Sequence, residues 1–155
     1  MNWKFAFVIV LALIAIVGSV ALVALEKSFS KTVTDTDLSV RTIQLAGQEL
    51  YVSVAETPEA RVRGLSGRTS LASNEGMLFI FDTAAKYGFW MKDMLFSIDI
   101  LWLSDTGEVV YMEESILPAT YPDVFAPNVP ARYVLELPAG FAEAYSVKVG
   151  DIVRL

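Results

Sequence analysis

The sequence predicts an α+β fold: a mainly antiparallel β domain that follows one N-terminal transmembrane helix. Three observations predict this fold: an apolar run without charge, short segments of alternating hydrophobicity separated by turn residues, and only two short helical segments. An open sheet leaves unpaired edges, so we expect the sheet to curl towards a small barrel.

The apolar run covers residues 5–25 and is long enough, at about 1.5 Å per helical residue, to cross a bilayer. An export signal has a core of roughly 7 to 15 residues and a small residue three places before its cleavage site. Here Leu22 would occupy that place, so we favour a retained anchor over a cleaved signal. Lys4 lies before the run, and Lys27 and Lys31 lie after it. The positive charges on the two sides nearly balance, so they give little indication of the orientation in the membrane. The usual behaviour of such anchors predicts a single-pass protein of the cell membrane with an extracytoplasmic domain.

Residues 1–4 then form a short tail, residues 26–37 a polar linker, and residues 38–155 one domain of common size. The chain contains neither cysteine nor histidine, which excludes disulfides, Ser-His-Asp and Cys-His catalysis, and the common zinc sites. We therefore predict no metal and no cofactor. The net charge of −6, without any run of Lys or Arg, predicts no nucleic-acid partner.

The strands are predicted from alternation and from the turn residues between them, such as Gly47-Gln48 and the turn 104–107. We expect strands at residues 40–46, 49–55, 76–82, 87–92, 97–103, 108–113, 132–137 and 151–155.

The two helices are predicted from their end signals. Thr57 can cap the first helix, Pro58 suits its first position, and Gly64 or Gly67 can end it. The second is expected at residues 139–147. Four prolines within residues 117–130 exclude a central strand or a helix there, which predicts a long ordered loop.

Six segments carry motifs that occur together in one known family: residues 61–68, 75–81, 89–94, 98–101, 133–140 and 148–151. Together they resemble a bacterial and archaeal family known as domain of unknown function 192. The resemblance covers about residues 52–153 and implies a small, mostly β domain, often exported or membrane-attached, without an established activity. Ser66 stands where the family has Met, and Asp93 where Asn is commoner.

The segment Phe89-Trp90-Met91-Lys92 is the richest in chemistry. In an extended strand Trp90 and Lys92 share one face, where a ring and an ammonium could hold an anionic or sugar-like ligand. The alternative is structural: Trp90 packs, and the methylene stem of Lys92 covers it.

Asp99 lies in an apolar strand, among residues that favour burial. A buried carboxylate needs a partner or a proton. It is therefore either a paired core residue or the bound acceptor of a turn, or else an acid, a base or a ligand's hydrogen-bond acceptor. Asp99 is our candidate catalytic residue.

Among the arginines, Arg63 is the expected ligand-binding residue, because the following Gly64 allows close approach. Arg61 is expected on a solvated helix face. Glu136 is expected to pair with Arg132 along one strand.

Two functions remain open from the sequence. The favoured one is a membrane-anchored module that binds an envelope ligand or a protein partner through Arg63, Trp90, Lys92 and Asp99. The alternative is a small hydrolase of an envelope polymer that works through carboxylates. Glycoside hydrolysis needs two carboxylates across a cleft, and only Asp99 has a suggestive context.

Overall fold

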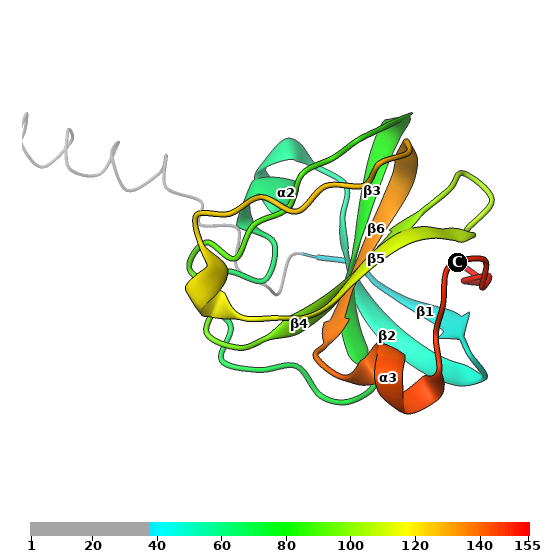
Figure 1. Ribbon diagram of the computed structural model, residues 1–155, viewed down its shortest axis with the longest axis horizontal. Coiled ribbons are helices and arrows are strands. Elements are labelled where there is room, and N and C mark those ends of the chain that lie inside the picture. Colours follow the sequence, from blue (N-terminus) through cyan, green and yellow to red (C-terminus); the bar gives the residue numbers. More distant parts are fainter. Residues whose placement is uncertain (1–37) are drawn as a thin grey trace, which may run out of the picture. The chain divides into compact units, whose positions relative to one another are not determined.

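The computed structural model describes residues 38–155, which form a six-stranded sheet with two short α-helices and one 3-10 helix. The strand order is β1-β2-β3-β6-β4-β5, as Figure 1 shows. Neighbours are antiparallel except β2 and β3, which run parallel. The elements are β1 (Val40–Leu45), β2 (Gln48–Ala55), α2 (Pro58–Arg63), β3 (Glu75–Ala85), β4 (Ile98–Leu103), β5 (Val109–Ile116), η2 (Pro118–Thr120), β6 (Ala131–Pro138) and α3 (Phe141–Tyr145).

The first hairpin turns one residue earlier than predicted. Gln48 pairs with Leu45, so the turn consists of Ala46 and Gly47. Their φ angles are 50° and 76°. Both residues are therefore left-handed, as a two-residue hairpin turn of type I′ requires.

Helix α2 begins and ends as predicted, and it connects the parallel strands β2 and β3. The hydroxyl of Thr57 accepts a hydrogen bond from the backbone N–H of Ala60 at 3.1 Å, and Pro58 occupies the first position. Gly64 ends the helix with a φ of 52°. Parallel neighbours need such a crossover, and this one places α2 beside β3.

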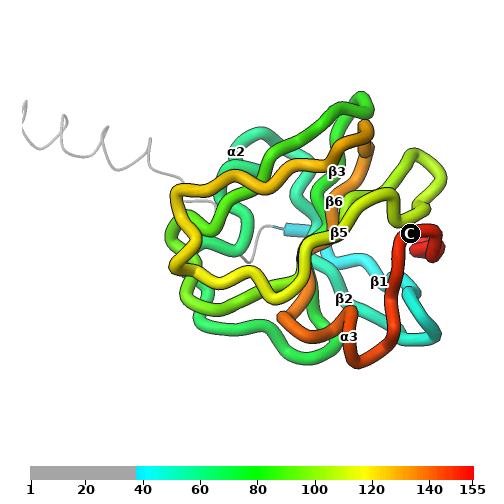
Figure 2. Tube along the Cα trace, in the orientation of Figure 1, coloured from blue at the N-terminus to red at the C-terminus, as the bar shows by residue number. Residues whose placement is uncertain are grey.

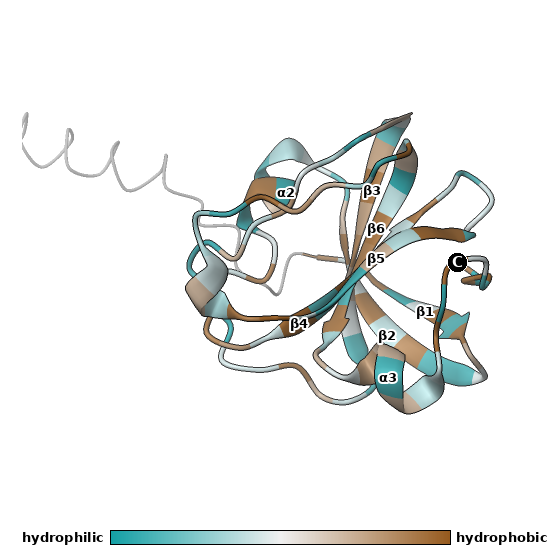
Figure 3. Cartoon of the chain, in the orientation of Figure 1, coloured by the Kyte–Doolittle hydropathy of each residue, from teal (hydrophilic) through white to brown (hydrophobic). Residues whose placement is uncertain are grey.

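The two faces of the sheet carry two apolar clusters, and β4 contributes to both. Every residue of β4 is buried, and Figure 3 colours most of the strand as hydrophobic. Asp99 is its one charged residue. Leu101 belongs to the cluster that also contains residues of α3. Trp102 belongs to the opposite cluster, with Phe79 and Val134. The candidate site lies on this second face.

The expected barrel is not formed, because the six strands do not close on themselves. The predicted final strand is also absent: residues 150–155 contain two isolated bridges instead, from Ile152 to Glu108 and from Arg154 to Gln44. Between them, the N–H of Val153 donates to the carbonyl of Gly107 at 2.8 Å. This segment therefore bonds to β1 and to the start of β5, and Figure 2 shows it near both strands.

Residues 87–92, which were predicted as a strand, are not one. Their backbone pairs with the rest of the protein through a single bridge between Phe89 and Phe125. Phe125 belongs to the proline-rich segment 117–130, which is a long ordered loop as predicted, with η2 near its start. Figures 1 and 2 show this loop running beside the chain that precedes β4.

No helix within residues 38–155 is long and apolar enough to cross a membrane. The predicted anchor at residues 5–25 and the linker at residues 26–37 lie outside the described residues. Both stay predictions.

Candidate functional site

A pocket of about 380 Å³ opens on the sheet face that carries Phe79 and Trp102. Its walls come from α2 and the turn after it, from β3, and from the segment that precedes β4, while β6 supplies its floor. Most of the lining side chains are apolar or aromatic. They belong to Pro58, Arg61, Val62, Arg63, Leu65, Ser66, Phe79, Phe81, Tyr87, Phe89, Trp90, Met94 and Glu136, with Gly64 and Gly88 completing the wall.

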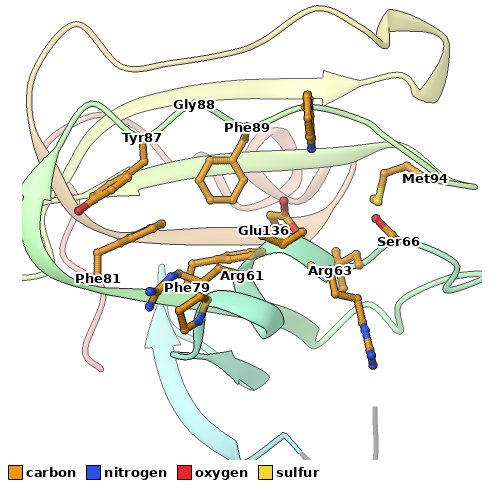
Figure 4. A pocket seen from close by; sticks show the side chains of 15 residues that line it. Arg61, Arg63, Ser66, Phe79, Phe81, Tyr87, Gly88, Phe89, Met94 and Glu136 are labelled. Atoms are coloured by element: carbon orange, nitrogen blue, oxygen red, sulfur yellow. The ribbon is translucent and has the colours of Figure 1, made fainter. Parts of the chain in front are cut away.

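Glu136 supplies the carboxyl group of this pocket. It lies in β6 between Met77 of β3 and Ile100 of β4, so it stands in the middle of the sheet. Its side chain is 5% exposed, and its Oε2 atom is buried without a hydrogen-bond partner. Figure 4 shows its carboxyl among the labelled pocket residues. Burial removes the carboxylate from water and raises the pKa of Glu136 to about 8.

The expected pairing of Glu136 with Arg132 is not seen. Glu136 Oε2 and Arg132 Nε are each buried without a hydrogen-bond partner, so they do not bond to one another. Arg132 instead holds its guanidinium carbon 5.8 Å from the ring centroid of Tyr133. Glu136 thus enters the pocket without the counter-charge that the sequence suggested.

Arg61 fastens α2 to β3, which contradicts the expected solvated position. Its Nη1 atom donates to the carbonyls of Glu56 at 2.7 Å and Ile80 at 2.8 Å. The guanidinium carbon also lies 5.1 Å from the ring centroid of Phe81. Arg61 therefore lines the pocket as a structural residue whose Nη1 donors already serve the backbone.

Arg63, the arginine predicted to bind a ligand, also lines the pocket. Figure 4 shows its guanidinium pointing away from Glu136. The turn after α2 is fixed from the other side, since Ser66 Oγ donates to the carbonyl of Lys92 at 2.9 Å and the N–H of Gly67 donates to that of Asp93 at 3.0 Å. The turn thereby stays close to the segment that precedes β4.

The aromatic wall comes from this segment and from β3. Tyr87 stacks on Phe81 with ring centroids 3.5 Å apart, and Phe89 meets Phe79 edge to face at 4.8 Å. Trp90 is 50% exposed at the rim. Edge-to-face and stacked pairs each add about 0.5–1.5 kcal/mol beyond the burial of area. The wall is therefore held in place before any ligand arrives.

The structure separates the predicted partners Trp90 and Lys92. Both side chains are exposed, as the alternation argument requires, although the segment is not a strand. Trp90 lines the pocket and contacts Tyr121 edge to face at 6.0 Å. Lys92 does not line the pocket. Its backbone carbonyl accepts the hydrogen bond from Ser66 Oγ. A ligand-binding role for Lys92 stays a prediction.

Asp99, the candidate catalytic residue, lies on the other face of the sheet. It is fully buried. Its Oδ1 atom accepts from the N–H groups of Ser115 at 2.8 Å and Gly140 at 3.2 Å, and Oδ2 accepts from that of Ala142 at 2.8 Å. These bonds are those expected of a buried acceptor that binds turns, and a site role for Asp99 stays a prediction. Its oxygens hold the end of β5 and the start of α3 in place, away from the pocket.

The described residues offer one carboxyl group to the pocket. Asp99 and Glu136 are both buried in the centre of the sheet, but Asp99 pairs with Leu137 while Glu136 pairs with Ile100. Successive residues of a strand point to opposite faces, so the two carboxyls cannot flank one bond. Within residues 38–155 there is also no cluster of three acidic side chains that could hold a metal ion.

The sequence indicated that Glu136 is unusual, but the expected pairing with Arg132 kept it from being chosen as a site residue. Glu136 stands between Leu135 and Leu137 in an apolar stretch of its strand, as Asp99 stands between Ile98 and Ile100. A charged residue at the centre of a buried strand is the unusual observation in both cases. The aromatic wall had no such signal, because its rings come from segments that only the fold brings together.

Comparisons with known proteins agree with this fold. A UPF0127 protein of Thermococcus gammatolerans is 29% identical over 105 residues, which cover 66% of this chain and 65% of that protein. One from Pyrococcus furiosus is 35% identical over 68 residues, 44% of this chain and 53% of its own length. The chain therefore spans less than two thirds of these relatives.

Two crystal structures share the fold. One is from Sinorhizobium meliloti 1021, described provisionally as a transcription regulator, with a TM-score of 0.72, 29% identity, and coverage of 76% of this chain and 94% of its own. The other is a protein of unknown function from Novosphingobium aromaticivorans, with a TM-score of 0.72, 24% identity, and coverage of 76% and 86%. The family model DUF192, described as "Uncharacterized ACR, COG1430", matches residues 41–155, so the chain belongs to the DUF192 family, as the sequence resemblance predicted.

Proposed function

We propose that this protein is a binding module that holds a small, mostly apolar molecule in the Glu136 pocket. One observation carries the proposal: a buried carboxyl group with an unpartnered oxygen at the floor of a pocket whose walls are aromatic. Leaving such a group unsatisfied costs about 1–3 kcal/mol, which a ligand that completes its hydrogen bonds would recover.

The dimensions of the pocket support this function. Its volume of about 380 Å³ lies within the range of roughly 300–1,000 Å³ that small-molecule sites occupy, and such sites combine apolar walls with a few polar groups. The wall residues contact one another without a ligand, since Phe79 touches Phe89 and Phe81 touches Tyr87. A preformed wall lowers the cost of ordering on binding.

Binding is favoured over hydrolysis for a geometric reason. Carboxylate-based cleavage of a glycosidic bond needs two carboxyl groups across one cleft. The lining residues supply Glu136 alone, while Asp99 lies on the opposite face of the sheet with both oxygens occupied.

The cellular setting is proposed from the sequence. The apolar run at residues 5–25 supports a single-pass anchor in the cell membrane with the binding domain outside the cytoplasm. An envelope ligand or a protein partner would then reach the pocket directly. The net charge of −6 disfavours nucleic acid as the partner.

The test is a thermal-stability screen of the full-length protein with envelope components and small fragments. A ligand that binds only the folded state raises the melting temperature. Hits should lose most of this stabilisation in Trp90→Ala, which removes the half-exposed ring at the rim. Tyr51→Ala is the matched control, because Tyr51 is an exposed ring outside the pocket. A screen without hits, or hits that stabilise Trp90→Ala and the parent protein equally, would contradict the proposal.

A further inference from the structure

The polar groups around the pocket differ in whether they are already bonded. Arg61 Nη1 donates to two carbonyls, and Ser66 Oγ donates to the carbonyl of Lys92. The guanidinium of Arg63 points away from Glu136 in Figure 4. Glu136 lines the pocket, and its buried Oε2 atom has no hydrogen-bond partner. Among the described residues, this carboxyl is therefore the group that a bound molecule would complete.

Resting on the proposed binding function, we propose that the ligand is a neutral aromatic or aliphatic molecule with an acceptor oxygen, which Glu136 binds as a protonated carboxylic acid. The donor would be the carboxyl O–H of Glu136, and the rings of Phe79, Phe89 and Trp90 would enclose the apolar part of the ligand.

The surroundings of Glu136 favour its neutral form. Its strand neighbours across the sheet, Met77 and Ile100, are apolar and fully buried. Desolvation disfavours a carboxylate unless a cation or several donors compensate, and no such donor reaches Oε2. With the pKa of Glu136 raised to about 8, the protonated acid is the main form near pH 7. A protonated acid can donate one hydrogen bond, which a carboxylate cannot.

Charged ligands fit the pocket less well. An organic cation would require Glu136 to lose its proton, and it would share the pocket with the cations Arg61 and Arg63. An anion would have to be desolvated beside an acid, while Arg61 Nη1 already serves the carbonyls of Glu56 and Ile80. A neutral acceptor requires no new buried charge.

Four probes of one size separate these ligand classes: acetophenone carries an acceptor oxygen, ethylbenzene lacks it, 1-phenylethylamine is a cation, and benzoate is an anion. Binding to the full-length protein is followed through the indole N–H signal of Trp90, which lines the pocket. We expect acetophenone to bind about three- to tenfold more tightly than ethylbenzene, as one net hydrogen bond allows, and more tightly than either charged probe.

Two variants of Glu136 identify the donor. The amide of Glu136→Gln can still donate, so it should keep the preference for acetophenone, whereas Glu136→Leu should bind acetophenone and ethylbenzene alike. In the parent protein this preference should disappear as the pH rises from 7 to 9, because the acid loses its proton. Glu136→Gln should keep it throughout.

Other titratable and charged groups line the pocket or lie on the same sheet face, so the Gln variant is the necessary control. Those of the pocket are Arg61 and Arg63 of α2 and Tyr87 of the segment before β4, and those of the sheet face are Arg132 of β6 and Glu113 of β5, which pairs with Ile100. A pH dependence that persists in Glu136→Gln belongs to one of these groups and contradicts the proposal.

The outcomes distinguish this inference from the proposed function. If ethylbenzene, the amine or benzoate binds as tightly as acetophenone, the inference is wrong while the pocket remains a binding site. The same holds if Glu136→Gln abolishes binding, or if the fragment screen gives pocket ligands but acetophenone does not bind. If neither the screen nor any probe gives binding, the proposed function is wrong as well.

Discussion

Asp99 and Glu136 show how the surroundings of a residue decide its role. Both are buried acids in adjacent strands of one sheet. Asp99 accepts three backbone N–H groups, which satisfy its charge. Glu136 has an oxygen without a partner, and its pKa is raised to about 8. We therefore propose a structural role for the satisfied acid and a ligand-binding role for the unsatisfied one.

Replacing Asp99 by Asn should destabilise the protein without changing the pocket. The amide can accept at one position only, so the N–H of either Ala142 or Ser115 loses its bond in a buried place. Hydrogen bonds to charged groups contribute about 1.5–3 kcal/mol each, so we expect a loss of at least that size in denaturant unfolding. Asp123→Asn, at an exposed acid, is the control and should change little. An Asp99→Asn protein of unchanged stability that no longer binds pocket ligands would instead make Asp99 a site residue.

Glu136 should make the stability of the protein depend on pH. Between pH 4.5 and about 8 the folded protein keeps the proton of Glu136 while the unfolded chain has lost it. Raising the pH across this window therefore favours the unfolded state. The stability that the protein has with Glu136 protonated in both states is lost once the pH passes the pKa of the folded state. Each pKa unit corresponds to about 1.4 kcal/mol, so Glu136→Gln should gain several kcal/mol over the parent protein between pH 5 and pH 8.

The measurement is denaturant unfolding of both proteins at several pH values, with Glu143→Gln, at an exposed acid, as the control. Equal pH profiles for the parent protein and Glu136→Gln would show that the carboxyl is charged in the folded state.

At the scale of elements, the sequence pattern predicted correctly those features that depend on interactions between near neighbours in the chain. The Thr57 cap begins α2 and Gly64 ends it as expected, because both act within one helical turn. The segment 87–92 alternates like a strand, yet it pairs through a single bridge. Its neighbour is the loop 117–130, in which prolines remove backbone donors. Pairing of this kind depends on segments far apart in the sequence, so alternation alone could not reveal it.

The same limit applies to the candidate site. The sequence identified Arg63 and Trp90, and both line the pocket. It placed Asp99 and Lys92 with them, but β4 turns Asp99 to the opposite face and Lys92 does not reach the lining. The sequence paired Glu136 with Arg132, because their spacing puts them on one side of a strand. In the structure, Oε2 of Glu136 makes no hydrogen bond. Register and the side of the sheet, which decide these outcomes, follow from pairing across the whole sheet.

Gly107 should control the attachment of residues 150–155. Its φ is 83°, and an added Cβ would lie 2.5 Å from the carbonyl oxygen of Val153. Gly107→Ala should therefore displace the segment and expose the N–H groups of Val153 and Arg154 to hydrogen exchange. Gly140→Ala is the control, because Gly140 has a φ of 84° but nothing within 4 Å of an added Cβ. If both variants exchange alike, strain in the glycine backbone rather than the close approach is the cause.

At the scale of the whole molecule, the chain combines two parts with different solvent requirements. Residues 38–155 belong to one compact unit whose apolar side chains fill two clusters. The run at residues 5–25 contains no charge and is predicted to lie in lipid. A domain with its own core is expected to fold without its anchor, and the anchor is expected to hold it at a membrane without contributing to the pocket.

This division predicts that the full-length protein and the isolated domain will appear in different fractions when membranes are separated from the supernatant. The full-length protein should stay with membranes in alkaline carbonate, because a retained apolar helix of this length does not leave the bilayer. A fragment of residues 38–155 should stay in the supernatant and unfold cooperatively in denaturant, as single domains under about 150 residues usually do. The membrane pellet is assayed with an antibody against the domain, and the fragment by denaturant titration with two spectroscopic probes.

The two arms test different parts of the prediction. Release of the full-length domain with a new N-terminus near Leu25 would show a cleaved signal, while the domain itself would stand. A fragment that lacks a cooperative transition, and regains one when residues 1–37 are restored, would show that those residues belong to the fold. Pocket probes should then shift the Trp90 signal equally in fragment and full-length protein, because the lining residues lie between Pro58 and Glu136.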